Sequence, residues 1–295
     1  MTSIFNGSTA ALVAALVMLS AGGAAADEWR EGGRLLLTNG VSTIEGSSGG
    51  GLATWAVIAG EETKNGIGAS AHATYLPLPN YQLRDYGVAV GVFNRLELSY
   101  AREEFDTGST GGKLGLGDGF TFHQDVVGAK LRVLGDLVYD QDALLPQISV
   151  GVQYKHNEQG AVIAAIGGKS ADGTDFYVAA TKLFLDQSLL LNATVRMTKA
   201  NQTGILGFGG DLGNSYSPEF EGSAAYLLTR RLAIGAEYRT KPNNLGLARE
   251  SNWYDVFAAY ALTRNLSLTA AFADTGSIVT FKSQRGPYLS LQAAF

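Results

Sequence analysis

The sequence has no cysteine and only three histidines among its 295 residues. The lack of cysteine excludes a disulfide framework, a thiol nucleophile and a cysteine-ligated metal. The formal net charge is −5, and there is no basic stripe with interleaved aromatic residues, which gives no support to nucleic-acid binding. Charged residues make up only 17% of the chain and hydrophobic residues 46%. This composition lies between those of soluble and membrane proteins.

Long apolar runs are also missing. The longest, AALVAALVML at residues 10–19, has the length of a signal-peptide core, and Ala24-Ala25-Ala26 offers a cleavage site before Asp27. The residues before this run carry no Lys or Arg, which departs from the usual signal pattern. We predict a cleaved signal peptide at 1–26 and one domain at 27–295, with a soluble N-terminal helix as the alternative. Because no later run could span a membrane as a helix, a closed barrel is the remaining integral membrane fold.

The rest of the chain alternates apolar and polar residues with a period of two. In the segment 231–241, Ile234 and Tyr238 alternate with Glu237 and Arg239. Successive strand residues point to opposite faces, so such a segment has one apolar and one polar face. The segments are about 9–12 residues long, the length of a tilted strand that crosses a bilayer. Short turns alternate with longer Gly- and Asn-rich loops, as expected for periplasmic turns and outer loops.

These features predict an all-β fold, an antiparallel up-and-down transmembrane β-barrel of about 12–14 strands. Gly46–Gly51 is an alternative linker to a plug or lip segment, which would remove the first two strands and leave about twelve. Aromatic residues near strand ends, Trp253 and Tyr288 among them, are typical of the bilayer interface. The predicted strands are 34–44, 52–59, 67–76, 81–93, 96–105, 122–134, 145–156, 174–185, 188–200, 216–228, 231–241, 252–262, 265–273 and 287–295.

The alternation along each strand places a set of charged residues on one face. This face is expected to line the lumen, because a charge in hydrocarbon costs several kcal/mol. Acidic and basic members are nearly balanced. Two interpretations follow: a hydrated pore with little ion preference, which we favour, or a closed barrel stiffened by a plug of ion pairs. The loop at 106–121 is a candidate to fold inward. The predicted lumen-lining residues are Glu97, Lys130, Arg132, Lys155, Arg196, Glu219, Glu221, Glu237, Arg239 and Asp255, with Gln153 and Asn192 beside them.

The C-terminal segment is a strand that ends on an aromatic residue. Leu289, Leu291 and Phe295 share the lipid face, while Ser290 and Gln292 turn inward. This pattern resembles the C-terminal assembly signal of outer-membrane barrels. The resemblance implies that Leu289, Leu291 and Phe295 are recognised by the barrel assembly machinery.

Longer stretches resemble an uncharacterised proteobacterial family of outer-membrane barrels, the domain-of-unknown-function family numbered 3034. The resemblance implies the barrel fold but supplies no activity, ligand or catalytic residue. The stretches that carry it are GRLLLTNGVSTIEGSSGGGL at 33–52, YGVAVGVFNRLELSYAREEFD at 86–106, QDVVGAKLRVLGDLVYDQD at 124–142, LPQISVGVQYK at 145–155 and RGPYLSLQAAF at 285–295.

Few residues offer catalytic or metal chemistry. Ser70 and His72 share a strand face, the arrangement of a lipid-acting hydrolase, but no third group that orients His72 is evident. His123-Gln124-Asp125 has poor spacing for a metal and is better explained as a solvated strand end. Gly115-x-Gly117-x-Gly119 and Gly207-x-Gly209-Gly210 precede no helical pattern, so we interpret them as flexible outer loops. We therefore predict no catalytic residues, no metal and no cofactor.

The favoured function is a passive or weakly selective outer-membrane channel for small solutes. A non-conducting structural or assembly barrel is the alternative, and a lipid-acting enzyme using Ser70 and His72 is the third hypothesis. The expected location is the bacterial outer membrane. The expected partners are outer-membrane lipids, lipopolysaccharide and the barrel assembly machinery, with no nucleic acid.

Overall fold

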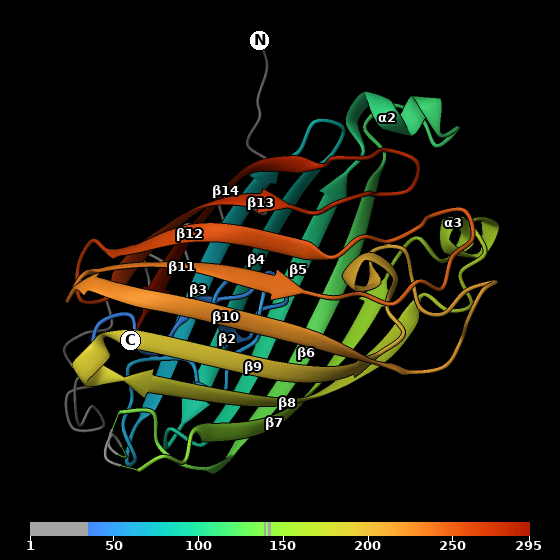
Figure 1. Cartoon of the computed structure of the whole chain (residues 1–295). Helices are drawn as coiled ribbons and strands as arrows, with labels where there is room; N and C mark the ends of the chain where they lie inside the picture. The colour runs from blue at the N-terminus through green and yellow to red at the C-terminus, as the bar shows by residue number, and fades with distance from the viewer. Residues whose placement is uncertain (1–34, 139, 141–142) are drawn as a thin grey trace.

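Residues 35–138, 140 and 143–295 are described by the computed structural model. In this part of the chain, β3 to β14 form one closed antiparallel barrel (Figure 1). Each strand pairs with its neighbours in sequence, and β14 pairs with β3 to close the ring. The predicted all-β, up-and-down barrel is confirmed, with the smaller of the two predicted strand numbers. The predicted signal segment 1–26 lies outside the described residues.

The predicted strands from 67 onward agree with the structure to within a few residues. No helix among the described residues combines the length and the apolar character needed to cross a membrane. The barrel strands are Ile67–Pro77 (β3), Gln82–Val92 (β4), Leu96–Asp106 (β5), Thr121–Leu134 (β6), Gln147–Asn157 (β7), Asp172–Phe184 (β8), Leu189–Thr198 (β9), Ser217–Thr229 (β10), Leu232–Arg239 (β11), Trp253–Ala261 (β12), Leu266–Asp274 (β13) and Arg285–Ala294 (β14). The short elements are β1 (Val41–Ser42), β2 (Ser48–Gly49), α2 (Gly108–Lys113), α3 (Gly160–Ala165), η2 (Leu185–Gln187) and η3 (Asn201–Gly204).

The first two predicted strands, 34–44 and 52–59, are wrong as barrel strands. The described residues of both segments, 35–44 and 52–59, enter the lumen, where the two-residue strands β1 and β2 pair with each other and Gly49 forms a single bridge with Thr54 (Figure 1). Their backbone groups are satisfied by side chains of the wall: Thr54 N–H donates to Glu221 at 2.8 Å. The alternation of apolar and polar residues could not reveal this, because a buried extended segment has the same sequence pattern as a barrel strand. The alternative, in which Gly46–Gly51 links a plug segment and twelve barrel strands remain, is confirmed.

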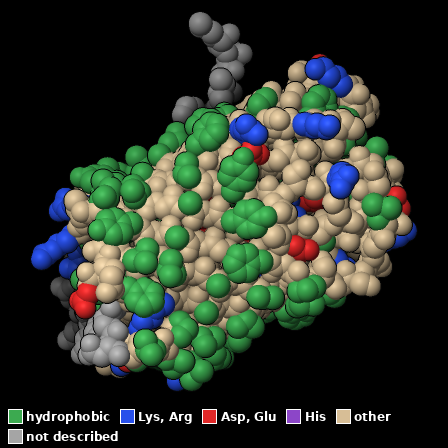
Figure 2. All heavy atoms as spheres, viewed as in Figure 1, with side chains coloured by type: hydrophobic (Ala, Val, Ile, Leu, Met, Phe, Trp, Pro, Cys, Tyr) green, Lys and Arg blue, Asp and Glu red, His purple; other side chains and the backbone are tan. Residues whose placement is uncertain are grey.

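The outer wall is apolar between its two ends. Ile234 and Tyr238 are exposed on β11, whereas Glu237 and Arg239 between and beyond them are buried. Figure 2 shows hydrophobic side chains over the middle of the wall and most charged side chains toward the ends. This is the outward-facing apolar band of a transmembrane barrel.

The two ends of the barrel differ. We call the end with the tight connections 93–95, 185–188, 230–231 and 262–265 the turn end; Phe295 also lies there, with its carbonyl accepting the N–H of Ala69 at 3.0 Å. The other end, the loop end, carries the connections 107–120, 158–171, 199–216, 240–252 and 275–284, with α2 and α3 (Figure 1). In outer-membrane barrels the longer connections usually face outward from the cell and the short ones face the periplasm.

Arginine at position 234 is expected to destabilise the barrel by about 2–4 kcal/mol, because a charge near the bilayer middle meets hydrocarbon. Ile234 pairs with Ala258, which lies between Tyr254 and Tyr260 on the outward face of β12. The matched control is Tyr238→Arg, on the same face but at the loop end, where the cost falls to about 0–1 kcal/mol. Unfolding in denaturant from lipid vesicles measures both. An equal loss for the two variants would mean that the membrane boundary is misplaced.

Candidate functional site

The lumen is filled by residues 36–61, which we call the plug (Figure 1). Thr43, Glu45 and Ala56 are fully buried inside the ring of strands. The plug turns back at Gly46, whose φ of +84° and close approach to Ala101 both require glycine: a Cβ there would lie 2.9 Å from the Ala101 Cβ. The plug therefore has two arms, one that runs into the lumen before Gly46 and one that runs back after it. Both ends of the plug lie at the turn end.

Glu45, at the tip of the plug, lies among three cations of the wall. Arg239 donates two hydrogen bonds to its carboxylate, at 2.8 and 2.9 Å. Lys155 donates a third, and a guanidinium nitrogen of Arg196 lies at 3.5 Å. Burial acts to raise the pKa of Glu45, but Arg239, Lys155 and Arg196 outweigh it and hold this pKa well below its usual value. Glu45 is therefore a charged anchor at neutral pH.

Wall carboxylates bind the backbone of the plug. Glu97 accepts hydrogen bonds from Ser48 N–H at 3.2 Å and from Ala59 N–H at 2.9 Å. Glu237 accepts one from Leu52 N–H at 2.7 Å. Because buried backbone groups need partners, these acids replace the ladder that a neighbouring strand would supply.

Lys130 binds carbonyl groups of the plug backbone, whereas the carboxylates bind its N–H groups. Its ammonium donates to the carbonyls of Ser48 at 3.0 Å and Val57 at 2.8 Å, and it pairs with Glu97 at 3.1 Å. The Lys130–Glu97 ion pair of the wall thus binds the arm that follows Gly46 at two places, Ser48 and the segment 57–59. Beside these polar contacts, Trp55 and Val57 of the plug belong to one buried hydrophobic cluster with wall side chains that include Leu183 and Phe257.

Of the ten predicted lumen-lining residues, two lie at the ends and are half-buried. Arg132 pairs with Asp136 at the turn end, and Glu219 accepts a hydrogen bond from Thr240 at the loop end. The other eight are buried on the inner face, where they surround the plug instead of an open pore. Hydrogen bonds or ion pairs join seven of them to the plug, and Asp255 lies opposite Glu237 on the neighbouring strand. The eight are Glu97, Lys130, Lys155, Arg196, Glu221, Glu237, Arg239 and Asp255.

The buried acids that the sequence analysis missed include Glu45 of the plug and three on the inner face of strands, Asp85, Glu103 and Asp175. Strand parity gave a usable signal for the three on strands, because each alternates with outward neighbours. No such signal existed for Glu45, whose position depends on the path of the plug. With these acids included, the expected near-balance of charge is wrong. Among the described strands, the inward-facing buried acids are seven (Asp85, Glu97, Glu103, Asp175, Glu221, Glu237, Asp255) and the cations four (Lys130, Lys155, Arg196, Arg239).

His72 is paired with an acid that the sequence analysis did not identify. Its Nε2 lies 2.5 Å from an Asp85 carboxylate oxygen, and both side chains are buried. Ser70 is buried on the same face, but none of the described hydrogen bonds joins it to His72. The ring of His72 also packs against Gly87, and both Ser70 and His72 are buried away from solvent. The geometry gives the Ser70–His72 hydrolase hypothesis no support.

The other two histidines lie near the loop end and pair with acids. His156 contacts Asp172 at 2.6 Å, and His123 lies 3.7 Å from Glu158. Asp125, the neighbour considered with His123, instead accepts a hydrogen bond from Arg102. In the described part of the chain, no group of three or more His, Cys, Asp and Glu is arranged for a metal ion.

The inward-folding loop is 199–216, which we call the cap loop, and not the predicted 106–121. The connection 107–120 closes on itself, with Gly119 N–H bonded to the Gly108 carbonyl at 2.8 Å, and α2 projects from the barrel (Figure 1). The cap loop instead enters the mouth. Its Thr203 carbonyl accepts hydrogen bonds from Lys155 at 3.0 Å and from Gln124 at 3.3 Å.

The glycines at 207, 209 and 210, expected in a flexible outer loop, are buried in the cap loop. Gln202 accepts a hydrogen bond from Lys241 at 2.6 Å, and Lys241 pairs with Glu250 at 3.2 Å. Burial lowers the pKa of Lys241 to about 8, although Glu250 acts to raise it. Lys241 therefore fastens the cap loop to the neighbouring connection 240–252.

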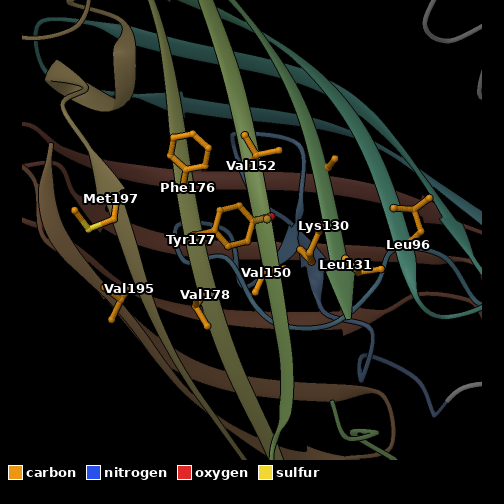
Figure 3. Close-up of a pocket in the computed structure, with 12 residues that line it drawn as sticks. Leu96, Lys130, Leu131, Val150, Val152, Phe176, Tyr177, Val178, Val195 and Met197 are labelled. Atoms are coloured by element: carbon orange, nitrogen blue, oxygen red, sulfur yellow. The ribbon is translucent and has the colours of Figure 1, made fainter. Parts of the chain in front are cut away.

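A groove of about 560 Å³ lies on the outer wall and not in the lumen. In Figure 3 its apolar side chains come from adjacent strands, with Phe176 and Val178 on β8 and Val150 on β7. These side chains are about half exposed or somewhat less. The groove thus belongs to the apolar band that faces lipid.

Similar folds occur among solved outer-membrane proteins. The KdgM porin in complex with disordered oligogalacturonate is 12% identical, with a TM-score of 0.50, and the match covers 77% of this chain and 99% of that one. The COG4313 outer membrane channel from Pseudomonas putida F1 is 11% identical, with a TM-score of 0.49 and coverage of 80% and 94%. Outer membrane phospholipase A from Escherichia coli is 9% identical, with a TM-score of 0.43 and coverage of 77% and 92%. At these identities the likeness concerns the fold alone.

The closed antiparallel ring, its apolar outer band and its polar interior define an outer-membrane-type β-barrel. Within that class, residues 38–292 match the family described as "Protein of unknown function (DUF3034)". The chain belongs to this family, as the resemblance of its sequence motifs implied. No curated protein matched the chain.

Proposed function

We propose that this protein is a bacterial outer-membrane channel for small solutes that its own plug keeps closed at rest. The observation that carries the proposal is the chemistry of the plug's attachment. Glu45 and the plug backbone bind polar side chains of the wall, the same groups that would face water in an empty lumen. These polar contacts can be exchanged for water when the plug leaves, although Trp55 and Val57 of the plug also belong to one buried hydrophobic cluster with Leu183 and Phe257 of the wall.

Some ion pairs of the lumen join two wall residues and do not involve the plug. Arg196 pairs with Glu221 at 2.6 Å and Lys155 with Asp175 at 2.7 Å, both between strands of the wall. Displacement of Glu45 therefore does not strip these cations of every partner. Breaking a buried pair costs about 3–5 kcal/mol when a charge is left without a partner or water. Retained pairs and entering water both reduce that cost.

The proposed channel prefers cations. Seven inward-facing acids against four cations leave fixed negative charge in the lumen once Glu45 has left with the plug. Fixed charge concentrates ions of the opposite sign along a narrow path. This preference replaces the weak selectivity expected from the sequence.

The test is a planar-bilayer recording of the refolded chain and its Glu45→Gln variant at pH 7. The wild type is expected to be closed most of the time. The variant loses the charge that attracts Arg239, Lys155 and Arg196, so we expect frequent openings and a reversal potential on the cation side in a salt gradient. Asp118→Asn, in an exposed loop, is the matched control and is expected to behave as wild type.

Acidic pH is expected to open the wild-type channel in the same way as the Glu45→Gln substitution. Because the pKa of Glu45 is depressed, its contribution to plug binding is fully present above the ordinary pKa of a glutamate. That contribution is lost only as pH falls through the lowered value. Openings of the wild type are thus expected at strongly acidic pH and not near pH 5.

The second candidate is a non-conducting structural barrel, favoured by the burial of every plug residue from 38 to 60. A Glu45→Gln variant that is folded, shown by an altered gel migration on boiling, and yet electrically silent would establish this alternative. We also propose location in the outer membrane, with lipids, lipopolysaccharide and the assembly machinery as partners. Fractionation of cells tests the location.

A further inference from the structure

One side of the barrel mouth at the loop end is apolar on its inner face. Leu76 on β3 pairs with Leu83 on β4, Leu83 with Phe105 on β5, and Phe105 with Phe122 on β6. All four side chains are buried and form one row across four strands. The mouth of a channel for hydrophilic solutes is lined by polar side chains at such positions. This row therefore indicates that the entrance favours less polar molecules than such a channel does.

Trp253 extends the apolar surface from β12. The sequence analysis placed it in the aromatic belt at the lipid interface, which is wrong: it points inward and is 3% exposed. Tyr288 is turned inward in the same way. Parity explains both, since the outward neighbours Tyr254 and Leu289 occupy the lipid face.

The indole N–H of Trp253 has no hydrogen-bond acceptor among the described residues. A buried donor without an acceptor is unfavourable, and a ligand with one acceptor atom would satisfy it. Lys241 lies over the ring of Trp253, 4.6 Å from its centre, which fixes the ring without occupying the N–H.

The cap loop covers this surface with two aliphatic side chains. Ile205 and Leu206 are buried against the apolar row. The backbone just before them is strained, because Gln202 and Thr203 adopt φ values of +46° and +62°. A β-branched residue such as Thr203 rarely adopts this conformation. The cap loop is thus held inward by its contacts and not by its own backbone preference.

A small enclosed void remains between the wall and the cap loop. Leu76, Leu83, Phe105 and Trp253 line it on one side, and Ile205 and Leu206 on the other. Its volume is about 10 Å³, room for roughly one water molecule. Larger occupants enter only if Ile205 and Leu206 move out, and such occupants would then meet the same apolar surface.

We propose that this outer vestibule is a binding site for a small neutral aromatic molecule with one hydrogen-bond acceptor. The ring replaces Ile205 and Leu206 against the apolar row, and its acceptor binds the indole N–H of Trp253. Anions bind poorly, because the lumen beneath the vestibule is rich in acids. Occupancy releases the strained cap loop, whose Thr203 carbonyl shares Lys155 with Glu45 of the plug. The role of the bound molecule as the transported solute rests on the proposed channel function, whereas binding itself does not.

The test uses 4-bromophenol, whose hydroxyl oxygen is an acceptor and whose bromine is located by anomalous diffraction. Calorimetric titration of the protein in nanodiscs, with empty nanodiscs subtracted, measures affinity. Leu206→Ala removes a competing side chain and is expected to tighten binding roughly tenfold, because a larger fraction of the protein is competent to bind. Leu212→Ala, in the same loop but exposed, is the matched control and should leave affinity unchanged.

Two further measurements address the donor and the charge. Trp253→Phe keeps the apolar surface but removes the N–H, and binding is expected to weaken about tenfold, the loss typical of one buried hydrogen bond. The probe 4-bromobenzoate is expected to bind at least about tenfold more weakly than 4-bromophenol, because its charge is repelled by the lumen acids.

Three outcomes overturn the site. They are no saturable binding by the wild type and Leu206→Ala, equal affinity for all variants, or a bromine peak only in the lipid-facing groove beside Phe176 and Val178. Bromine beside Trp253 supports it. Conductance of Glu45→Gln separates this proposal from the channel: binding without conductance rejects only the channel, and conductance without binding rejects only the vestibule.

Discussion

Replacing Lys155 with methionine is expected to loosen both ends of the lumen at once. The ammonium of Lys155 binds Glu45 in the plug, Asp175 in the wall at 2.7 Å, and the Thr203 carbonyl in the cap loop at 3.0 Å. Removing it leaves Glu45 and Asp175 with less compensation, which for a buried pair costs about 3–5 kcal/mol. Denaturant unfolding should show this loss, and limited proteolysis should cut both the plug and the cap loop.

Lys130→Met is the matched control for this experiment. Lys130 is equally buried and also binds the plug, through the carbonyls of Ser48 and Val57, but it does not contact the cap loop. Its replacement is expected to release the plug and raise conductance while proteolysis of the cap loop stays at the wild-type level. If both variants expose the cap loop equally, Lys155 is not the link between the two ends.

Replacing Phe295 with alanine is expected to remove most of the barrel from the outer membrane of cells while refolding in detergent stays near wild type. The substitution keeps the backbone seal, in which the Phe295 carbonyl accepts hydrogen bonds from Glu61 N–H at 2.9 Å and Ala69 N–H at 3.0 Å. Only the ring is lost. Leu289 and Leu291, exposed on the lipid face, remain in place. Cell fractionation and the shift in gel migration on boiling measure the two yields.

Deletion of Phe295 makes the informative comparison. It removes the backbone seal as well, and an unpaired group facing lipid costs several kcal/mol. We therefore expect the deletion to lower refolding in detergent, whereas Phe295→Ala does not. Normal cellular assembly of Phe295→Ala would show that the ring is not part of an assembly signal, and the residue would then serve only to close β14 against β3.

The barrel strands could be predicted because the pattern that defines them lies within each short segment of the sequence. A segment with one face in lipid must alternate, and this alternation located β4 at 81–93, where the structure has Gln82–Val92. The same rule turned Glu237 and Arg239 inward. It failed for 34–44 and 52–59, since alternation reports burial of one face and not the identity of the neighbour that supplies hydrogen bonds.

The candidate site was predicted only as a set of inward charges. Parity places Glu221 in the lumen but cannot show that it accepts a hydrogen bond from Thr54, 167 residues away in sequence. Nor does it show that His72 meets Asp85 across the β3–β4 pair. Such contacts depend on strand register and on the path of the plug, which no local pattern encodes.

By itself, the sequence determined that the chain closes into a barrel, which face of a strand such as β11 meets lipid, and where the last strand lies, although it placed Trp253 and Tyr288 on the wrong face. These follow from the period of two and from the cost of unpaired backbone in hydrocarbon. Only the tertiary structure decided that the lumen is closed, because closure depends on Glu45 meeting Lys155, Arg196 and Arg239 from three different strands. It also decided that Leu76, Leu83 and Phe105 form one apolar row, since that row exists only in the register that joins their strands.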